Sequence, residues 1–556
     1  MPLVSTMTSL REALVAAIKS LLRGKSFIKA FLAVWTPTAG TPVTTQDAAA
    51  AAAAGTPKAG ADPAADFLAE IEHMFLGYIE DGGLKRFSRK LKRQFKERLR
   101  SNPDCMLPSY NSQLPTGLET GQYLALDVGG STLRVALVDL RGRGTAGTES
   151  GIVQMDSFKI DSDVRDLKGT EFFDWMAERI HWTMAKDGSK EKKGHSPEEP
   201  LLVGLAWSFP IEQTSSKGGK LCGMGKGFLA HAGLIGEDLG DIIKTACQKQ
   251  GLHVELSAIV NDSSAALLSE AYLTPSTRFS LILGTGVNIA AHLPVHTIDA
   301  AKFGARPPSW HDAASHVIVN TELGMFGHDI LPLSKWDVLL KAAHPRPEFQ
   351  PLEHLVSGYY LGELCRLVLL DAIPATGVFG GEVPPSLLTP YSLDTETLSL
   401  IEADKTPSHP TALALFTARH PSPVPATPSD ISFLRTLSSH IARRSASLVA
   451  ASLFALWELK SESERALLDS LTDPSSPFAL ETEAELAIAT KGRTAVAFNG
   501  SVVERYPGYG SALQGFVDGL VKGEGEVGME LVEASESSLR GAAVALACLV
   551  GAEGGE

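Results

Sequence analysis

The alternation of apolar and polar positions predicts strands and helices that follow one another along most of the chain. A glycine turn joins two apolar runs at 123–139 and again at 279–292, which predicts two β-hairpins. Further strands are predicted at 201–209, 255–260 and 494–501. Apolar residues at helical spacing predict helices at 263–273, 352–371, 432–459 and 539–549. Strands that alternate with helices indicate α/β layers.

The first 35 residues have a different pattern, that of a basic amphipathic helix or pair of helices. Basic residues such as Lys19, Arg23 and Lys25 outnumber the one acid, Glu12, and apolar residues recur at helical spacing. Charges interrupt every window of about 20 residues, the length that a membrane span needs, and a signal peptide's uncharged core is missing. Two hypotheses stay open: residues 7–35 dock on a membrane surface, such as that of mitochondria, or they pack against the main body or a partner.

The remaining chain divides into a tether and two lobes. Residues 36–65 are rich in Ala, Pro, Thr and Gly, including the alanine run 48–54, which predicts a flexible linker. A chain of 556 residues is too long for one core. We therefore predict a small lobe at 66–261 and a large lobe at 262–550, with the last helix packing back on the small lobe.

Composition excludes some classes of function. The formal charge of −14 argues against direct nucleic-acid binding, which needs a basic surface to neutralise phosphates. The five cysteines are scattered without metal-ligand spacing, which is typical of reduced thiols in an intracellular protein. The sequence also lacks the glycine patterns of a P-loop and of a dinucleotide-binding fold.

The turn of the first hairpin has the residues of a phosphate site. Gly129 and Gly130 can bring backbone N–H groups close to phosphates if they adopt positive φ, and the hydroxyls of Ser131 and Thr132 add donors. Asp127, at the strand end, can hold Mg²⁺ through water. The alternative is an ordinary hairpin turn.

Asp262 is the best candidate for a general base. It follows a strand and precedes a helix, so its carboxylate can be oriented to accept a proton from a hydroxyl. The competing interpretation is that Asp262 is the N-cap of that helix. Polar residues beside apolar or glycine-rich segments can recognise a polyol, and they are Ser208, Lys226, Asn261, Asn288, Glu322 and Glu353.

In this order along the chain, these segments resemble the eukaryotic hexokinase and glucokinase family. The matching segments, which run from about residue 67 to residue 549, are 106–117, 127–134, 208–213, 225–228, 261–262, 284–288, 320–327, 353–363 and 500–507. The resemblance implies an α/β two-lobe fold of the actin-like ATPase (ribonuclease-H-like) type, with a cleft between the lobes. It also implies ATP-dependent phosphorylation of the 6-hydroxyl of a hexose such as glucose, fructose or mannose, the first step of glycolysis, with Mg²⁺. A cytoplasmic protein, associated with the mitochondrial surface if the N-terminal segment docks there, is expected.

The resemblance also implies roles for individual residues. Asp262 would take the proton of the hydroxyl, and Lys226 would stabilise the transferring phosphoryl group. The hexose would be held by Ser208, Asn261, Asn288, Glu322 and Glu353. ATP and its phosphates would be held by Asp127, Gly129, Gly130, Ser131, Thr132, Arg134, Gly284, Thr285, Gly286, Gly500 and Ser501.

Several positions depart from the family's pattern, among them Thr132, Met224 and Asn499, and three of the departures bear most on binding. Gly225 replaces a threonine that would contact the sugar, and Ser537 and Leu539 replace two glycines near the nucleotide. If those glycines need positive φ, Leu539 is the most damaging change. Two hypotheses therefore remain: an active hexokinase, or a weakly active or inactive hexokinase-like sugar sensor that acts through protein partners.

Overall fold

The computed structural model describes residues 62–145, 147–186, 196–225, 227–304, 306–522 and 527–553. The chain divides into two units, Met1–Asp62 and Pro63–Glu556, and every element below belongs to the second. The predicted amphipathic segment 1–35, the predicted linker up to residue 61, and Lys226 lie outside the described residues. The last residues assigned to the linker, 63–65, are the first turn of helix α3 (Pro63–Leu76).

The first sheet has five strands in the order β4-β3-β2-β5-β8. These are β2 (Thr120–Val128), β3 (Thr132–Arg141), β4 (Ser150–Lys159), β5 (Leu201–Trp207) and β8 (Val254–Val260). The hairpin β2–β3 is antiparallel, whereas β5 and β8 run parallel to β2. Alternate residues of β2 enter different cores, because helices cover both faces: Leu124 and Leu126 join one apolar cluster and Ala125 joins another.

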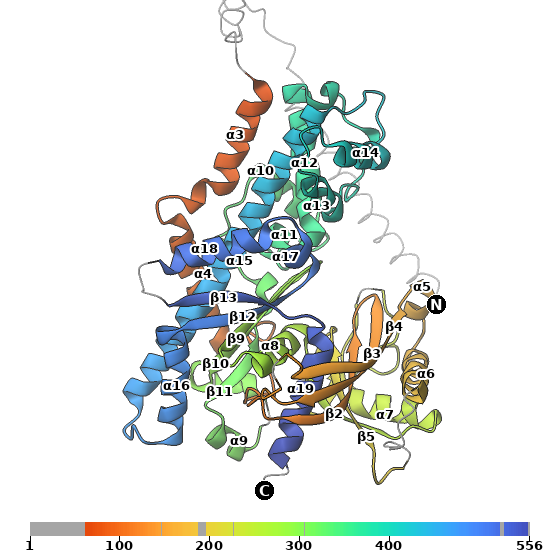
Figure 1. Ribbon diagram of the computed structural model, residues 1–556, viewed down its shortest axis with the longest axis vertical. Helices are drawn as coiled ribbons and strands as arrows, with labels where there is room; N and C mark the ends of the chain where they lie inside the picture. Colours follow the sequence, from red (N-terminus) through yellow and green to blue (C-terminus); the bar gives the residue numbers. More distant parts are fainter. Residues whose placement is uncertain are drawn as a thin grey trace, which may run out of the picture. The chain divides into compact units, whose positions relative to one another are not determined.

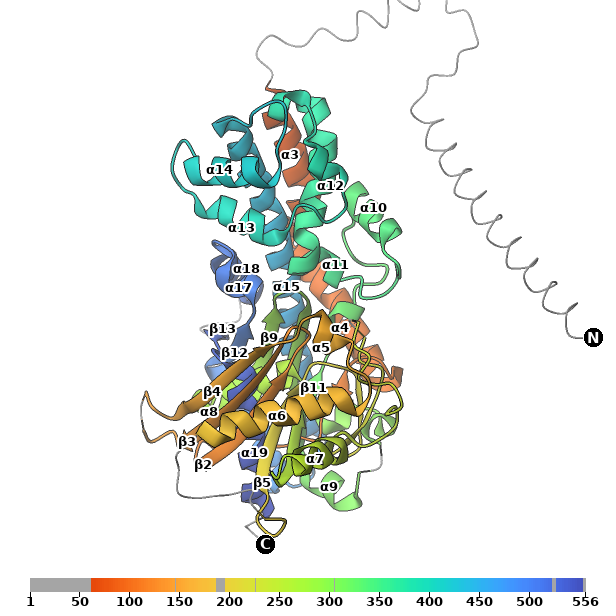
Figure 2. The same ribbon diagram turned by 90° about the vertical axis from the view of Figure 1, so that its right-hand side faces the viewer.

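Helices α6 (Thr170–Lys186) and α7 (Leu239–Lys249) cover the outer face of this sheet (Figure 2). The inner face packs against α8 (Asp262–Leu273) and α19 (Ser537–Glu553). The approach of α19 is close: a Cβ on Gly204 would lie 2.2 Å from the Ala542 carbonyl oxygen, and one on Gly541 would lie 2.0 Å from that of Ala265. Glycine at these two positions is therefore required for the packing.

The second sheet has six strands in the order β1-β11-β10-β9-β12-β13. Their bounds are β1 (Leu107–Pro108), β9 (Thr277–Leu283), β10 (Val287–Pro294), β11 (His316–Asn320), β12 (Arg493–Asn499) and β13 (Gly528–Glu533). The hairpin β9–β10 is the second predicted one, and β12 pairs with β9 in parallel. Ala290 and Ile318 of this sheet share an apolar cluster with α8 and α19, so these two helices lie between the sheets (Figure 1).

Long helices cover the other face of the second sheet (Figure 1). They include α3, α4 (Gly83–Ser101), α12 (Gly358–Thr376), the 43-residue α15 (Pro428–Ser470) and α18 (Tyr509–Val521). The residues of α3 and α4 that are buried, such as Phe75 and Phe95, share one core with the second sheet. The packing thus groups residues 66–108 with the second sheet, whereas the sequence pattern assigned them to the first lobe. The reason is that apolar periodicity shows that a face is buried but not against which partner.

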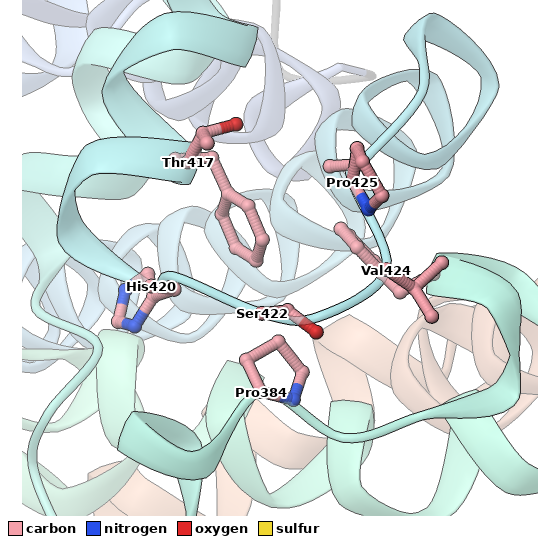
Figure 3. A pocket seen from close by; sticks show the side chains of 9 residues that line it. Pro384, Thr417, His420, Ser422, Val424 and Pro425 are labelled. Carbon is pink, nitrogen blue, oxygen red and sulfur yellow. The ribbon is translucent and has the colours of Figure 1, made fainter.

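The proline-containing stretch 374–431 forms two helices, α13 (Thr395–Ala403) and α14 (Pro410–Arg419). A cavity of about 10 Å³ lies beside α14, with room for about one water molecule (Figure 3). Its lining residues include Phe379, Phe416, His420 and Ser422. The cavity is too small for a sugar or a nucleotide, so the functional site is elsewhere.

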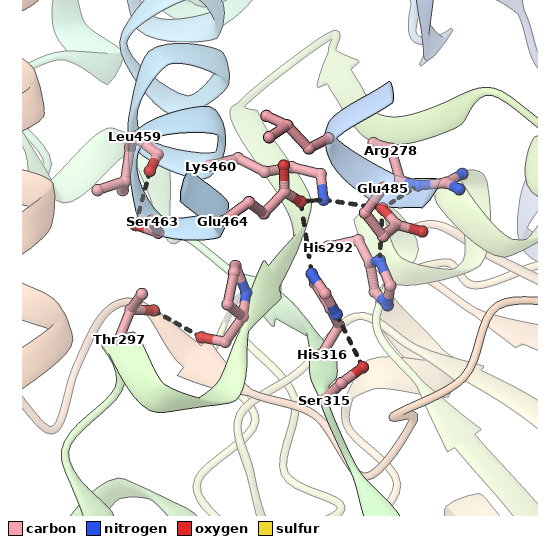
Figure 4. Close-up of polar contacts among 12 residues, drawn as sticks. Arg278, His292, Thr297, Ser315, His316, Leu459, Lys460, Ser463, Glu464 and Glu485 are labelled. Atoms are coloured by element: carbon pink, nitrogen blue, oxygen red, sulfur yellow. Dashed lines mark hydrogen bonds and ion pairs between the residues drawn. The ribbon is translucent and has the colours of Figure 1, made fainter. Parts of the chain in front are cut away.

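A buried charged network joins the second sheet to α15 and to α16 (Pro477–Lys491) (Figure 4). Its members are Arg278, His292, His316, Lys460, Glu464 and Glu485. The Lys460 ammonium donates to both glutamates, and Arg278 Nε donates to Glu485 Oε2 at 2.5 Å. Burial alone would raise the pKa of the Glu485 carboxyl, but the neighbouring cations, Lys460 foremost, hold it well below its usual range.

The two carboxylates of this network face the Lys460 ammonium and the Arg278 guanidinium, and the ammonium lies between the two carboxylates. Burial lowers the pKa of His292 to about 4, so that ring is neutral at neutral pH. A buried carboxylate that loses its cation is strongly destabilising.

Substituting Lys460→Met should therefore lower the free energy of unfolding by about 3–5 kcal/mol, because Glu464 and Glu485 lose their shared cation. Urea unfolding at neutral pH measures the change. Lys249→Met is the matched control: Lys249 contacts Asp174 at 2.7 Å, but both side chains are exposed, so the change should be below about 1 kcal/mol. Equal effects of the two substitutions would contradict the account of the network.

Candidate functional site

A cavity of about 450 Å³ opens where strand ends of both sheets meet the first residues of α8 and α19. Its lining residues are Asp127, Gly129, Ser131, Thr132, Arg134, Ser157, Ser208, Asp262, Ile282, Asn499 and Ser538. The structure thus brings the first hairpin turn, Ser208 and Asp262 to one cavity. These groups are far apart in the sequence and come together because α8 and α19 pack between the sheets.

The first hairpin turn is closed by its own backbone: the Gly129 N–H donates to the Thr132 carbonyl at 3.0 Å. The positive φ expected in the first turn is not found at Gly129, and Gly284 and Gly286 of the second turn do not have it either. A Cβ added at Gly129 would lie 3.6 Å from the nearest atom, the Thr132 carbonyl oxygen, which is an ordinary contact distance.

Asp127, at the end of β2, is bound by Arg134 from the neighbouring strand. Arg134 Nε and Nη2 donate to the same oxygen, Oδ2, at 2.9 and 2.5 Å, and Nη1 donates to Glu536 at 2.5 Å. Burial raises the pKa of the Asp127 carboxyl; the Arg134 guanidinium opposes this effect, and the Glu536 charge adds to it. Arg134 thus links the first turn to the segment before α19.

Asp262 is the first residue of α8 and not its N-cap. Asn261 is the cap, since its Oδ1 accepts from the Ser264 N–H at 2.8 Å. The capping interpretation of Asp262 is therefore wrong. The Asp262 carboxylate lies at the positive end of the helix dipole, where negative charge is stabilised, and its Oδ1 accepts from the Ser263 N–H at 2.7 Å. A carboxylate in this position lines the cavity and can accept a proton from a bound hydroxyl.

Three of the predicted sugar-binding residues, Asn261, Asn288 and Glu322, belong to one connected hydrogen-bond network. Asn288 Nδ2 donates to Asn320 Oδ1 at 2.8 Å, and Asn320 Nδ2 donates to Glu322 Oε1 at 2.8 Å. Ser263 Oγ accepts from the amides of both Asn261 and Asn288, at 3.1 and 3.3 Å. These residues come from the start of α8, from β10 and from the end of β11.

Glu322 combines backbone strain with a shifted pKa. Its φ is 51° and its ψ is 54°, a left-handed conformation that is uncommon for a residue other than glycine and that occurs more often at functional sites. Burial raises the pKa of the carboxyl, the Asn320 hydrogen bond lowers it, and the charge of Asp262 raises it. Glu322 and the candidate base are therefore electrostatic neighbours.

The second hairpin turn contacts both the sugar-binding and the adenosine-side segments. A Cβ on Gly286 would lie 2.8 Å from Glu353 Oε2, an oxygen that also accepts from the Val287 N–H at 3.0 Å. A Cβ on Gly500 would lie 2.4 Å from the Leu283 carbonyl, and Gly500 has φ 127°. Ser501 and Thr285 are exposed next to these glycines. Glycine at these turns therefore makes room for neighbouring groups.

Leu539, which the sequence singled out as a potential obstacle to nucleotide binding, does not line the cavity. Its side chain is fully buried in the apolar cluster of α8 and α19, and the cavity wall is formed by its neighbour Ser538. The expectation of strained φ at Ser537 and Leu539 is wrong, because both residues are helical; in this segment only Glu536 has positive φ, at 51°.

The other departure from the family's pattern is Gly225, the residue before Lys226. Lys226 itself is outside the described residues. Met224 is buried in the core of the first sheet, and Gly225 is exposed with φ 64°. Gly225 thus adopts a backbone conformation that other residues rarely adopt. An added Cβ at this position would meet no atom within 4 Å, so the backbone conformation and not crowding favours glycine here.

Sequence reasoning missed several residues that the structure brings to the site. Asn320 and Ser263 belong to the hydrogen-bond network, and Ser157 and Ser538 line the cavity. Asn320 has a signal in the sequence, since it ends a strand two residues before Glu322. Ser157 is one polar residue in a strand of alternating burial, and nothing in the sequence distinguishes it from other exposed positions.

Comparisons with known proteins converge on one family. Two family models, both described as hexokinase, match residues 69–272 and 278–548. The chain is 32% identical over 356 residues to Hexokinase-2 of Candida albicans, which covers 64% of this chain and 70% of that protein. It is 29% identical over 451 residues to the hexokinase of Kluyveromyces lactis, covering 80% and 84%.

A solved structure supports the same grouping. The hexokinase from Schistosoma mansoni complexed with glucose aligns with a TM-score of 0.67 and 25% identity, covering 87% of this chain and 99% of that one. The predicted α/β fold of the two-lobe, actin-like sugar kinase type is thereby confirmed.

The substitution Leu539→Gly introduces the glycine that is typical of hexokinases at this position. It should destabilise the protein by about 3–5 kcal/mol and should not raise its activity. The reason is that the side chain fills a core and does not obstruct the cavity. Urea unfolding and a turnover assay measure both effects. Leu480→Gly, in the first turn of α16 at 57% exposure, is the control and should cost about 1 kcal/mol. A stable Leu539→Gly protein with higher turnover would contradict this assignment.

Proposed function

The chain belongs to the hexokinase family and phosphorylates hexoses with ATP, and on this premise we propose that the 450 Å³ cavity is its active site. The observation that carries the proposal is that Asp262 and the first hairpin turn line the same cavity. Asp262 can accept a proton from a hydroxyl while the hairpin turn holds the phosphates, which is the arrangement that phosphoryl transfer needs.

Asp262 is the proposed general base for the 6-hydroxyl of the hexose. The carboxylate is held at a helix N-terminus, where negative charge is stabilised, and it takes the proton as the hydroxyl oxygen attacks the γ-phosphoryl group. Since this transfer depends mainly on positioning and charge stabilisation, the fixed start of α8 contributes by holding the acceptor in place.

The hexose is held by the network described above. Glu322 and Glu353 accept hydrogen bonds from sugar hydroxyls, whereas the amides of Asn261 and Asn288 both donate and accept. Ser208, at the end of β5, lines the cavity and adds a hydroxyl. Because Asn261, Asn288 and Glu322 are already held in one hydrogen-bond network, this part of the site is organised before the sugar binds, which lowers the entropic cost of binding.

ATP is assigned to the wall formed by the hairpin turns. Gly129, Gly130, Ser131 and Thr132 offer backbone and hydroxyl donors to phosphates. The second turn and the Gly500–Ser501 segment contribute Gly284, Thr285, Gly286, Gly500 and Ser501. Lys226 is proposed to stabilise the transferring group, as the resemblance implies, and its structure is outside the described residues.

Asp127 fits the magnesium ion that accompanies ATP. Arg134 occupies only Oδ2 of this carboxylate, and Asp127 lines the cavity, so the remaining lone pairs suit a metal-bound water. When bound with ATP, the ion would neutralise phosphate charge. The role of this chain's residues is to orient the phosphates beside it.

The burial of Leu539 removes one of the two arguments for an inactive sugar sensor, because this residue does not obstruct the cavity.

We also assign the N-terminal segment, residues 7–35, to docking on a membrane surface. The docked protein is expected at mitochondria, and the remaining protein in the cytoplasm. The basic amphipathic pattern supports this assignment. Among the described helices, none has both the length and the apolarity to cross a membrane.

Asp262→Ala should reduce kcat at least about 100-fold, because the hydroxyl loses its proton acceptor. A coupled assay of ADP release with glucose, fructose and mannose, at saturating ATP and Mg²⁺, measures it. Asp241→Ala is the matched control, since Asp241 is an exposed acid in the first turn of α7, and it should keep wild-type turnover. Wild-type turnover no higher than that of Asp262→Ala would refute the proposed function.

Deleting residues 1–35 should shift the protein from the membrane fraction to the soluble fraction of cells, because the basic amphipathic surface is lost. A full-length variant with Lys19→Glu, Arg23→Glu and Lys25→Glu reverses charge while keeping the length, and it should shift in the same way. Co-sedimentation with vesicles that contain anionic phospholipid gives the direct measurement. An unchanged distribution of both proteins would rule out membrane docking.

A further inference from the structure

We propose that Asn320 is a positioning residue for the hexose: it fixes the orientation of the Asn288 amide and donates a hydrogen bond that holds the Glu322 carboxylate in place as an acceptor for the sugar. The inference rests on the proposed function, in which Asn288 and Glu322 bind the sugar. Asn320 itself reaches the sugar-binding groups only through these two side chains.

The orientation of the Asn320 amide is dictated by its neighbours. An ionised carboxylate only accepts hydrogen bonds, so the nitrogen of Asn320 must face Glu322 Oε1, at 2.8 Å. The oxygen of Asn320 then faces Asn288 and must receive a donor, which is Asn288 Nδ2 at 2.8 Å. The Glu322 N–H, at 3.3 Å, donates to the same oxygen.

The constraint continues from Asn288 toward the candidate base. With its nitrogen committed to Asn320, Asn288 turns its oxygen to the Ile289 N–H, at 2.8 Å. The same nitrogen lies 3.3 Å from Ser263 Oγ, which also receives Asn261 Nδ2 at 3.1 Å. Each amide therefore has one permitted orientation. The hydrogen bond from Asn320 to Glu322 fixes the orientation of the Asn320 amide, and this amide then fixes that of Asn288.

Asn320 also acts on the charge of Glu322. Burial raises the pKa of this carboxyl, and the hydrogen bond from Asn320 opposes that effect. The groups that face Glu322 from neighbouring elements are Asp262 of α8, whose charge raises its pKa, and the Cys105 thiol before β1. Glu353 of α11 (Glu353–Val356) packs against Gly324, two residues further on.

The sign of the expected pH effect follows. Without the Asn320 donor the pKa of Glu322 rises further, so a larger fraction of the carboxyl is protonated at a given acidic pH. A protonated Glu322 offers one acceptor fewer to the sugar. As the pH is lowered, a protein without the Asn320 donor should therefore lose its affinity for hexose at a higher pH than the wild-type protein does. Binding of ATP, which we assign to other residues, has no such dependence.

Asn320→Ala should raise the KM for hexose about tenfold, with the KM for ATP within about twofold, since one hydrogen bond to a charged group is lost. In a plot of kcat/KM for hexose against pH, the decrease at acidic pH should occur at a higher pH in this variant than in the wild-type protein. Titration calorimetry with glucose measures the same loss of affinity without turnover. An unchanged hexose KM and an unchanged pH profile in this variant would overturn the inference.

Asn320→Asp gives a sharper test, because it keeps the shape of the side chain. Two adjacent carboxylates share one proton, so at low pH the variant still donates to Glu322, and at higher pH both become charged and repel. Its hexose KM should therefore approach the wild-type value at the acidic end and rise as pH increases. Gln248→Glu, which adds a carboxylate at an exposed position of α7, is the control and should show wild-type profiles.

Failure of this inference is distinguishable from failure of the proposed function. If the wild-type protein releases no ADP in the presence of hexose, or if Glu322→Gln keeps the wild-type KM for hexose, the assignment of the sugar site is overturned, and the role of Asn320 with it. If wild type is active, Glu322→Gln loses hexose affinity, and both Asn320 variants behave as wild type, only the role of Asn320 is overturned.

Discussion

The close approach of α19 to α8 and to β5 is the contact on which the functional site depends. A Cβ at Gly541 or Gly204 would meet a backbone carbonyl at 2.0 or 2.2 Å, so only glycine permits this packing. The two helices between the sheets begin at the cavity, and they bring Asp262 and Ser538 to its wall. The first hairpin turn and strand ends of both sheets reach the same cavity. The contact between α8 and α19 therefore brings the parts of the site together.

Charge is distributed around this cavity in a consistent way: each carboxylate has a particular donor. Arg134 binds Asp127, the Ser263 N–H binds Asp262, Asn320 binds Glu322 and the Val287 N–H binds Glu353. Burying a carboxylate without such a donor would be costly and would neutralise it. At Asp127 and Glu322 the donor opposes the rise in pKa that burial causes. Hydrogen-bond acceptors of this kind are what a polyol with a transferable proton requires.

Much of the fold could be predicted because local patterns determine it. Two glycine hairpins, the strands 201–209 and 255–260, and the helix after Asn261 follow from apolar spacing and turn residues. Contacts between distant segments could not be predicted in the same way. The packing of α3 and α4 with the second sheet, the burial of Leu539 and the choice of Asn261 over Asp262 as the cap all depend on neighbours that periodicity does not identify.

A crystal structure of the protein with glucose and a non-hydrolysable ATP analogue tests the central claim most directly. The account predicts the sugar's 6-hydroxyl within about 2.6–3.2 Å of the Asp262 carboxylate, with the phosphates of the analogue on the turn 129–132. Glucose or nucleotide bound away from this cavity, or an Asp262 carboxylate turned away from the 6-hydroxyl, would contradict it.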